Sequence, residues 1–185
     1  MDLNVHIERE VGPGTVPFCD VFKGFERVQA VEAIFGAETE KILSELNVEV
    51  ADGRGYMHID AEKGSIVVNS KYLREGEEMH VYLDVIHELV HIKQHREGKE
   101  LWDRRFAYVD RPTEIEAYRA AVKEAKRIGL GGDDLVEYLK VEWVAEGDFL
   151  RMLRTLGVQA RRIARRHPRG RGPVRRRALR VSSGQ

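Results

Sequence analysis

The sequence predicts an α+β fold in which a small antiparallel sheet is followed by two long amphipathic helices, further C-terminal helices and a basic tail. Three observations predict it. Short apolar segments separated by Gly-containing turns lie between residues 48 and 69, apolar residues recur at helical spacing from 77 to 97, and the same spacing returns from 112 to 128. A chain of 185 residues is long enough for one domain with a hydrophobic core.

The N-terminal part is expected to consist of short elements. Residues 3–9 predict a strand, and apolar spacing predicts one or two helices over about 25–46 with a break near Gly36. Three strands are expected next, separated by the turn signals Asp52-Gly53 and Lys63-Gly64, at Val48–Ala51, Tyr56–Asp60 and Ser65–Asn69. The third strand is either an edge on which an extended peptide could lie or a buried strand, and the sequence leaves both open.

The C-terminal part is expected to be helical. No Gly or Pro interrupts residues 77–97, and the core-facing stripe there is Tyr82, Val85, Ile86, Leu89 and Val90. A polar linker leads to a helix that begins at Pro112 and stops at Gly129. Two more helices are expected at about 134–145 and 148–165. The residues from Arg166 on are rich in Arg, Gly, Pro and Ser and are expected to be disordered.

The zero net charge hides a division between two segments. Residues 1–150 contain 19 Lys and Arg against 31 Asp and Glu, a balance of −12, whereas residues 151–185 contain 12 Arg and no acidic residue, a balance of +12. This asymmetry predicts a body of residues 1–150 and an Arg-rich segment of residues 151–185 that binds a partner or the body itself.

The cysteine content and the absence of apolar spans bear on the compartment. The single cysteine, Cys19, excludes an internal disulfide framework and is expected to be a buried thiol in a reducing compartment. The first residues lack a basic signal region, and no segment approaches the roughly 20 apolar residues of a membrane span. We therefore expect a cytoplasmic protein without membrane contact.

The sequence His87-Glu88-Leu89-Val90-His91 lies in the middle of the helix expected over 77–97. Residues four positions apart in a helix lie about 6 Å apart along its axis and on the same face, so both imidazoles can reach one ion. Zinc accepts such nitrogens, and a carboxylate beside zinc-bound water can take its proton. The pattern favours a zinc site with Glu88 as general base over two histidines that merely hydrogen bond in a core.

The third metal ligand is expected from another element. His95 continues the spacing of the two histidines, but eight helical residues rise about 12 Å, too far for three imidazoles to meet at one ion. On the helix from Pro112, Glu114 shares a flank with small residues that allow close approach, whereas Glu116 projects toward water. We therefore expect His87, His91 and Glu114 as ligands. The alternative for Glu114 is an acidic residue that stabilises the helix N-terminus.

These motifs resemble those of the gluzincin zinc peptidases, in which His-Glu-x-x-His on one helix is completed by Glu from a later helix. Glu114-Ile115-Glu116-Ala117 looks like the Glu-x-x-Ala form of that later helix, where the first Glu is the ligand. The resemblance covers about residues 45–130, is similar in economy to the archaeal minigluzincins, and implies a zincin-like fold. Tyr118 departs from the Asp that many relatives have after this Ala.

The expected function is zinc-dependent peptide-bond hydrolysis by a metalloendopeptidase, active or latent, with a peptide or protein substrate. Donors for the oxyanion are open among Tyr108, Tyr118, His95 and Arg119. The alternative is a nucleic-acid-associated zinc protein that uses its Arg-rich C-terminus and has no peptidase activity. A third possibility is that this segment folds back on the acidic body and blocks the cleft.

Overall fold

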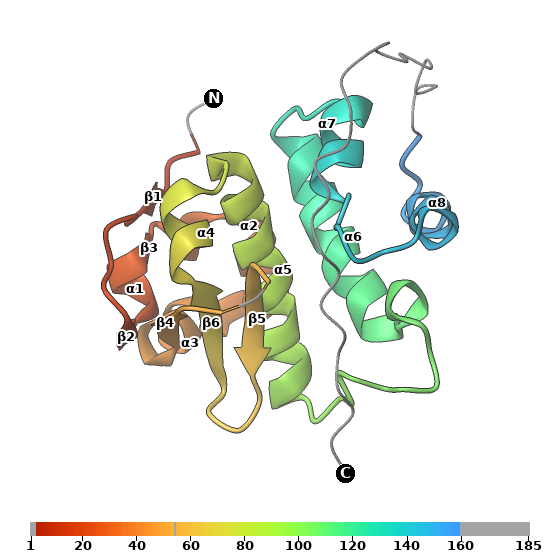
Figure 1. Ribbon diagram of the computed structural model, residues 1–185. Coiled ribbons are helices and arrows are strands. Elements are labelled where there is room, and N and C mark those ends of the chain that lie inside the picture. The colour runs from red at the N-terminus through yellow and green to blue at the C-terminus, as the bar shows by residue number, and fades with distance from the viewer. Residues whose placement is uncertain (1–2, 54, 160–185) are drawn as a thin grey trace.

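The structure of the chain is a computed structural model that describes residues 3–53 and 55–159 (Figure 1). The strands are β1 (His6–Ile7), β2 (Gly14–Pro17), β3 (Phe22–Lys23), β4 (Asn47–Ala51), β5 (Met57–Asp60) and β6 (Ser65–Asn69). The α-helices are α1 (Phe18–Val21), α2 (Gln29–Phe35), α3 (Thr39–Glu45), α4 (Ser70–Glu75), α5 (Glu78–Arg96), α6 (Pro112–Arg127), α7 (Gly132–Tyr138) and α8 (Glu146–Thr155). Short 3-10 helices are η1 (Phe25–Arg27), η2 (Gly36–Glu38) and η3 (Tyr108–Asp110).

The main sheet has four strands in the order β2-β4-β6-β5. The expected small sheet is therefore present, and its outer pairings, β2 with β4 and β5 with β6, are antiparallel. The central pairing differs from the expectation, because β4 and β6 run parallel, with Val48 opposite Ile66. The chain reaches β6 through β5, which folds back as a hairpin and leaves β6 beside β4. As a result β6 is an interior strand, which agrees with the buried alternative and not with the edge; β5 and β2 are the edge strands.

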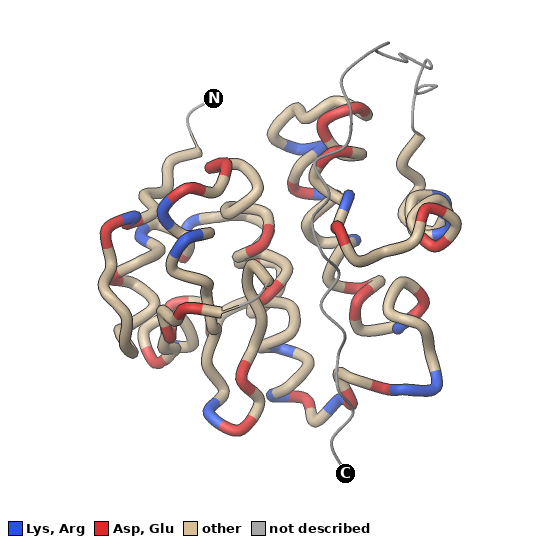
Figure 2. Tube along the Cα trace, viewed as in Figure 1, with Lys and Arg blue, Asp and Glu red and all other residues tan. Residues whose placement is uncertain are grey.

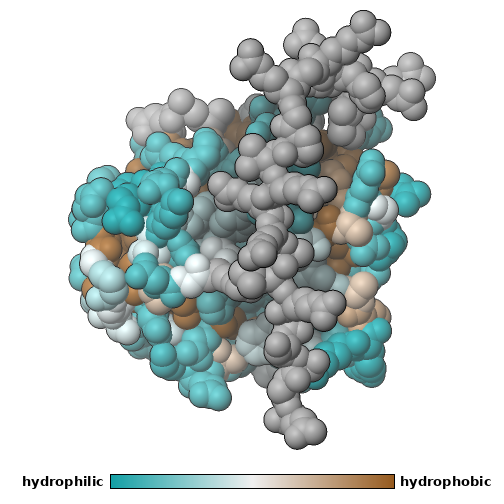
Figure 3. All heavy atoms as spheres, viewed as in Figure 1, coloured by the Kyte–Doolittle hydropathy of each residue, from teal (hydrophilic) through white to brown (hydrophobic). Residues whose placement is uncertain are grey.

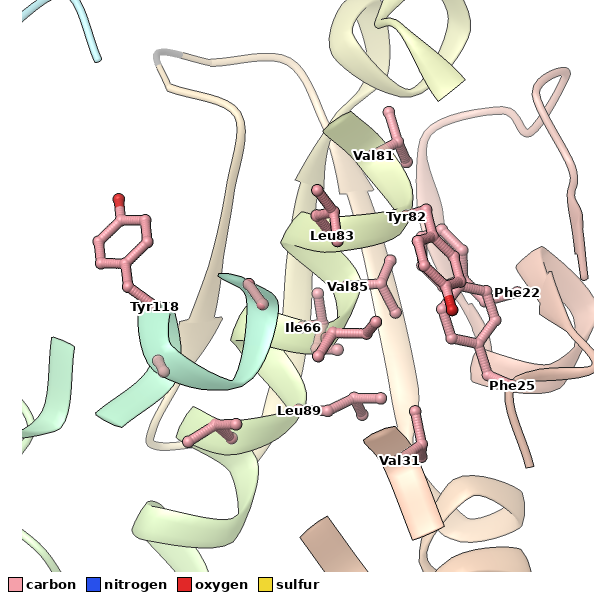
Figure 4. Close-up of a cluster of buried hydrophobic side chains, with 14 of the residues drawn as sticks. Phe22, Phe25, Val31, Ile66, Val81, Tyr82, Leu83, Val85, Leu89 and Tyr118 are labelled. Carbon is pink, nitrogen blue, oxygen red and sulfur yellow. The ribbon is translucent and has the colours of Figure 1, made fainter. Parts of the chain in front are cut away.

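Helix α5 lies between the sheet and helices α6 to α8 (Figure 1). Its apolar stripe is buried as expected: Tyr82 packs on Phe25 with ring centroids 5.5 Å apart, and Val85 and Leu89 lie beside Ile66 of the sheet (Figure 4). Each such side chain contributes about 1.5–3 kcal/mol by leaving water. This burial fixes which face of α5 points at the sheet, and the opposite face is left to α6.

Several elements differ in extent from the sequence expectation. Helix α7 ends at Tyr138 and does not continue to residue 145, where a run of β-branched and aromatic residues favours helix less. Helix α8 ends at Thr155, because Gly157 adopts a left-handed conformation (φ 63°) that terminates it. The residues expected to extend this helix beyond 159 and the expected disordered tail lie outside the described residues.

Cys19 is exposed on α1, so the expectation of a buried thiol is wrong.

The packed body continues past residue 150. Met152, Leu153 and Leu156 belong to the same buried cluster as the side chains of α5, and Arg151 of α8 binds both carboxylate oxygens of Asp110 in η3 at 2.8 Å. Acidic residues are spread over both sides of the described chain (Figure 2), and the visible surface is mostly hydrophilic with apolar side chains between (Figure 3). Within 3–53 and 55–159, none of the helices has the length and apolar character needed to cross a bilayer.

Candidate metal centre

The two histidines and the glutamate of the helix motif are all buried in α5. One helical turn separates His87 from His91, and their Nε2 atoms lie 2.9 Å apart. Their rings meet nearly edge to face, with centroids 4.6 Å apart. The local helix geometry expected from the sequence therefore brings the two nitrogens to one point.

Helix α6 brings the carboxylate of Glu114 to the same point. Its Oε2 atom lies 3.4 Å from Nε2 of His87 and 3.5 Å from Nε2 of His91. Ala117 and Ala121 are fully buried where α6 meets α5, and their small side chains allow the two backbones to approach. Glu116 is exposed, as expected, and binds Lys99.

The spacing of these three groups fits a single metal ion. One candidate ligand atom from each residue lies within 4.8 Å of the other two, and the two histidines are the polar neighbours of the buried Oε2 of Glu114 in the described part of the chain. Donors bonded to one tetrahedral zinc at about 2.0–2.1 Å lie about 3.3 Å apart. The observed separations are close to that value. His95, excluded on geometric grounds in the sequence, is not part of the group.

Burial and mutual charge set the protonation of the cluster. Burial alone would lower the pKa of His91, but Glu114 and Glu88 more than offset it and raise that pKa to about 9. Burial lowers the pKa of His87, against the opposing effect of Glu114. Burial would raise the pKa of Glu114, but the two histidines hold it well below its usual value. The site thus favours a positive charge between the imidazoles and the carboxylate, which a proton or a metal ion can supply.

Gln94 is a site residue that the sequence reasoning missed. Its Oε1 accepts a hydrogen bond from Nδ1 of His91 at 2.7 Å, while its Nε2 donates to the backbone oxygen of Thr113 at 3.0 Å. This fully buried amide orients the His91 ring so that Nε2 points at His87 and Glu114, and it ties α5 to the start of α6 beside Glu114. The signal in the sequence is a polar residue three positions after His91 on a buried face.

A cavity of about 220 Å³ opens beside the cluster. Glu88, His91 and Glu114 line it, together with Tyr108 and Arg111 from the segment that precedes α6. The edge strand β5 supplies another wall through three consecutive residues, 57–59. Burial raises the pKa of Glu88 to about 8, with further increases from Asp84 and Glu114 and a partial decrease from His91. A carboxylate with a strong affinity for a proton therefore faces the same space as the candidate ligands.

The structure separates the four candidate donors for an oxyanion. Tyr108 lines the cavity, and its hydroxyl is hydrogen bonded to that of Tyr118 at 2.7 Å. Tyr118 belongs to the buried apolar cluster (Figure 4) and packs its ring 4.4 Å from the ring of His87. Arg119 is exposed, and His95 does not line this cavity. Arg111, which the sequence did not suggest, lines it and stacks over Tyr108.

Tyr118 also occupies the position where the resembled family often has a histidine-binding carboxylate. Nδ1 of His87 is buried and has no hydrogen-bond partner among residues 3–53 and 55–159. The two histidines are thus held differently, His91 by an amide and His87 by packing against a ring. The capacity of this group to hold a metal ion rests on its own geometry. Comparison of the chain with protein-family models, with curated proteins and with solved structures gives no match.

Proposed function

We propose that this protein is a zinc-dependent metalloendopeptidase in which His87, His91 and Glu114 bind zinc and Glu88 is the general base. One observation carries the proposal: two buried imidazole nitrogens and a buried carboxylate oxygen from a second helix lie within 3.5 Å of one another. Two imidazoles and one carboxylate are a ligand set of catalytic zinc, whereas Mg²⁺ and Ca²⁺ prefer oxygen ligands.

When bound, zinc would act as a Lewis acid on a water molecule and on the scissile carbonyl. Glu88 lines the cavity beside the candidate ligands, so its carboxylate is placed to accept the proton of that water. The water oxygen forms a bond with the carbonyl carbon, the carbon–nitrogen bond breaks, and Glu88 passes the proton to the leaving amine.

Two further features of the cavity support a peptide substrate. The edge strand β5 borders the cavity, and its outer side can pair with an extended backbone. Tyr108 lies in the same cavity with a pKa raised strongly by burial and by the charge of nearby groups, so its hydroxyl stays protonated and can donate to a developing oxyanion. The bond between Asp110 and Arg151 helps to hold η3, which carries this tyrosine.

Metal analysis and one isosteric variant test the proposal. The purified full chain should bind about one zinc and hydrolyse a mixed peptide library, and chelation should abolish hydrolysis. Glu88→Gln should retain zinc and lose hydrolytic activity by a factor on the order of 10³ or more. Glu78→Gln is the matched control, because this exposed glutamate lies on the same helix away from the cluster. Stoichiometric iron in place of zinc, or unchanged hydrolysis in Glu88→Gln, would contradict the proposal.

The nucleic-acid alternative depends on arginines that lie almost entirely outside the described residues. Of the 12 arginines from residue 151 on, only Arg151 and Arg154 are described. Arg151 is engaged by Asp110 and Asp148, so it is not available as a phosphate ligand. The self-inhibitory contact would also involve the residues after 159, which lie outside the described residues. Neither idea gains a supporting observation from the described part of the chain.

A further inference from the structure

A second cavity, of about 430 Å³, lies next to the candidate metal centre where α4, α5, α6 and α7 meet. The proposed hydrolysis assigns it no role. Its lining includes the rings of Tyr56, Tyr72, Tyr118 and Tyr138 and the carboxylate of Asp84. A water molecule takes about 30 Å³. The cavity is many times larger than that, so it has room for a side chain.

Asp84 and the Tyr138 hydroxyl are the polar groups of this cavity that bear on its ligand. Asp84 is partly buried and accepts a hydrogen bond from the Tyr72 hydroxyl at 2.6 Å, and no cationic side chain forms an ion pair with it in the described chain. Burial raises the pKa of Asp84 to about 6, although the hydroxyls of Tyr72 and Tyr138 and the charge of His80 act in the opposite direction. Tyr138 also lines the cavity and is only 7% exposed, and its hydroxyl is close enough to Asp84 to lower the pKa of that carboxyl.

Aromatic walls around a carboxylate are the surroundings that an organic cation prefers. The rings of Tyr56 and Tyr72 lie 4.8 Å apart, and ring faces attract cations, arginine most often. At the rim, Glu137 and Glu142 outnumber Lys140, so the entrance is acidic. A flat guanidinium can stack on these rings while it donates hydrogen bonds to a carboxylate.

This cavity is close enough to the metal centre to hold a residue of the same peptide. Tyr118 lines the cavity and also packs on the ring of His87 at 4.4 Å. Asp84 lies four residues before Glu88 on α5, which is about 6 Å along the helix. An extended peptide advances about 3.3 Å per residue, so the site lies within one or two residues of the bond that Glu88 would attack.

We propose that this cavity binds the basic side chain of a peptide, with arginine preferred, and that it gives the proposed peptidase its specificity; the second part rests on the proposed function. Asp84 neutralises the guanidinium, Tyr138 and Tyr72 surround it, and Tyr56 stacks on it. The basic residue can come from an external substrate or from the Arg-rich C-terminal segment of this chain, because both present the same side chain.

A binding measurement tests the cavity without any need for catalysis. In the full-length Glu88→Gln variant, N-acetyl-arginine amide should bind, and the neutral isostere N-acetyl-citrulline amide should bind about tenfold more weakly or worse, as followed by calorimetry. Adding Asp84→Asn should weaken the arginine compound by a similar factor, about tenfold, because the carboxylate charge is lost. Adding Glu78→Gln instead is the matched control and should change neither affinity. Equal binding of the two compounds, or full binding in Asp84→Asn, would overturn the proposal.

Hydrolysis of peptides separates this proposal from the peptidase proposal. An active wild-type enzyme should cleave peptides that contain arginine near the scissile bond faster than their citrulline counterparts, and Asp84→Asn should remove that difference. Hydrolysis without arginine preference would refute the specificity pocket and leave the peptidase. Arginine binding by a zinc protein that cleaves nothing would refute the peptidase and leave the cation site.

A further variant tests whether the basic residue comes from an external peptide or from the C-terminal segment of this chain. Replacing the ten arginines after residue 159 with glutamine in the full chain removes any internal competitor. If the C-terminal segment occupies the cavity, this change should strengthen binding of N-acetyl-arginine amide by about tenfold. If the natural occupant is an external peptide, the affinity should stay the same. In either case the compound with the charged side chain must bind better than its neutral isostere.

Discussion

Gln94 of α5 contacts both His91 and helix α6. Its Oε1 accepts a hydrogen bond of 2.7 Å from Nδ1 of His91, and its amide nitrogen donates to the backbone oxygen of Thr113 in α6. One buried side chain therefore orients a candidate ligand and positions the turn of α6 that carries another. Outer partners of this kind commonly affect metal affinity by about 10- to 100-fold.

Replacing this amide should weaken metal binding without removing a ligand. Gln94→Leu keeps the approximate volume, frees the His91 ring, and removes the hydrogen bonds from the amide nitrogen to the Thr113 carbonyl and to Glu116. We expect zinc affinity to fall about 10- to 100-fold, measured by competition with a coloured chelator. Glu78→Gln should bind zinc as wild type does. An unchanged affinity in Gln94→Leu would show that His91 is oriented by packing alone.

Removing the phenolic oxygen that faces the metal cavity should impair hydrolysis and spare metal binding. In Tyr108→Phe the donor to the proposed oxyanion is lost, while the ring can still pack beside Tyr118. We expect kcat to fall about 10²-fold with little change in KM and with zinc retained. Tyr118→Phe is the comparison, because it breaks the same hydrogen bond and leaves the Tyr108 hydroxyl in place. Equal losses in the two variants would show that hydrolysis depends on the hydrogen bond between the two tyrosines and not on the Tyr108 hydroxyl as a donor.

Asp84 should make the protein less stable as the pH rises. Its pKa is about 6 in the folded chain and 3.8 in the unfolded reference, so the folded state binds the proton more tightly. The stability from this group is complete below about pH 4 and is lost as the pH rises through about 6. Asp84→Asn keeps an acceptor for Tyr72 and removes the charge.

The two proteins should therefore unfold with similar free energies near pH 4. Above pH 6 the Asn variant should be more stable by up to about 3 kcal/mol, in urea titrations followed by circular dichroism. A constant difference across this range would contradict the raised pKa. A more stable Asn variant is also a suitable protein for the binding test of the second cavity.

A buried bond between α5 and α6 should affect stability and leave the metal centre intact. The Tyr82 hydroxyl donates to Glu124 at 2.6 Å, and Arg127 binds the same carboxylate at 2.6 and 2.7 Å. Tyr82→Phe should lower the free energy of unfolding by about 1–2 kcal/mol, since a bond to a charged acceptor is lost while Arg127 still pairs with it. Zinc affinity should be unchanged. A parallel loss of zinc would show that this contact also sets the separation of the two helices at Glu114.

The sequence reasoning succeeded where the information is local. The uninterrupted apolar spacing of α5, the proline at the start of α6 and the glycines near residues 36 and 129 predicted the helices and their ends with small errors. The convergence of His87 with His91 follows from the helical period alone. Small residues on one flank of α6 indicated that Glu114 faces α5, and the structure places it there.

The sequence by itself determined which residues could meet on one helix face, because the period of a helix depends only on the backbone. Only the tertiary structure decided the partners of those residues. The parallel pairing of β4 with β6 and the edge position of β5 depend on contacts between distant segments, and so do the support of His91 by Gln94 and the cavity around Asp84. Such contacts are chosen by the packing of whole elements, which no local pattern encodes.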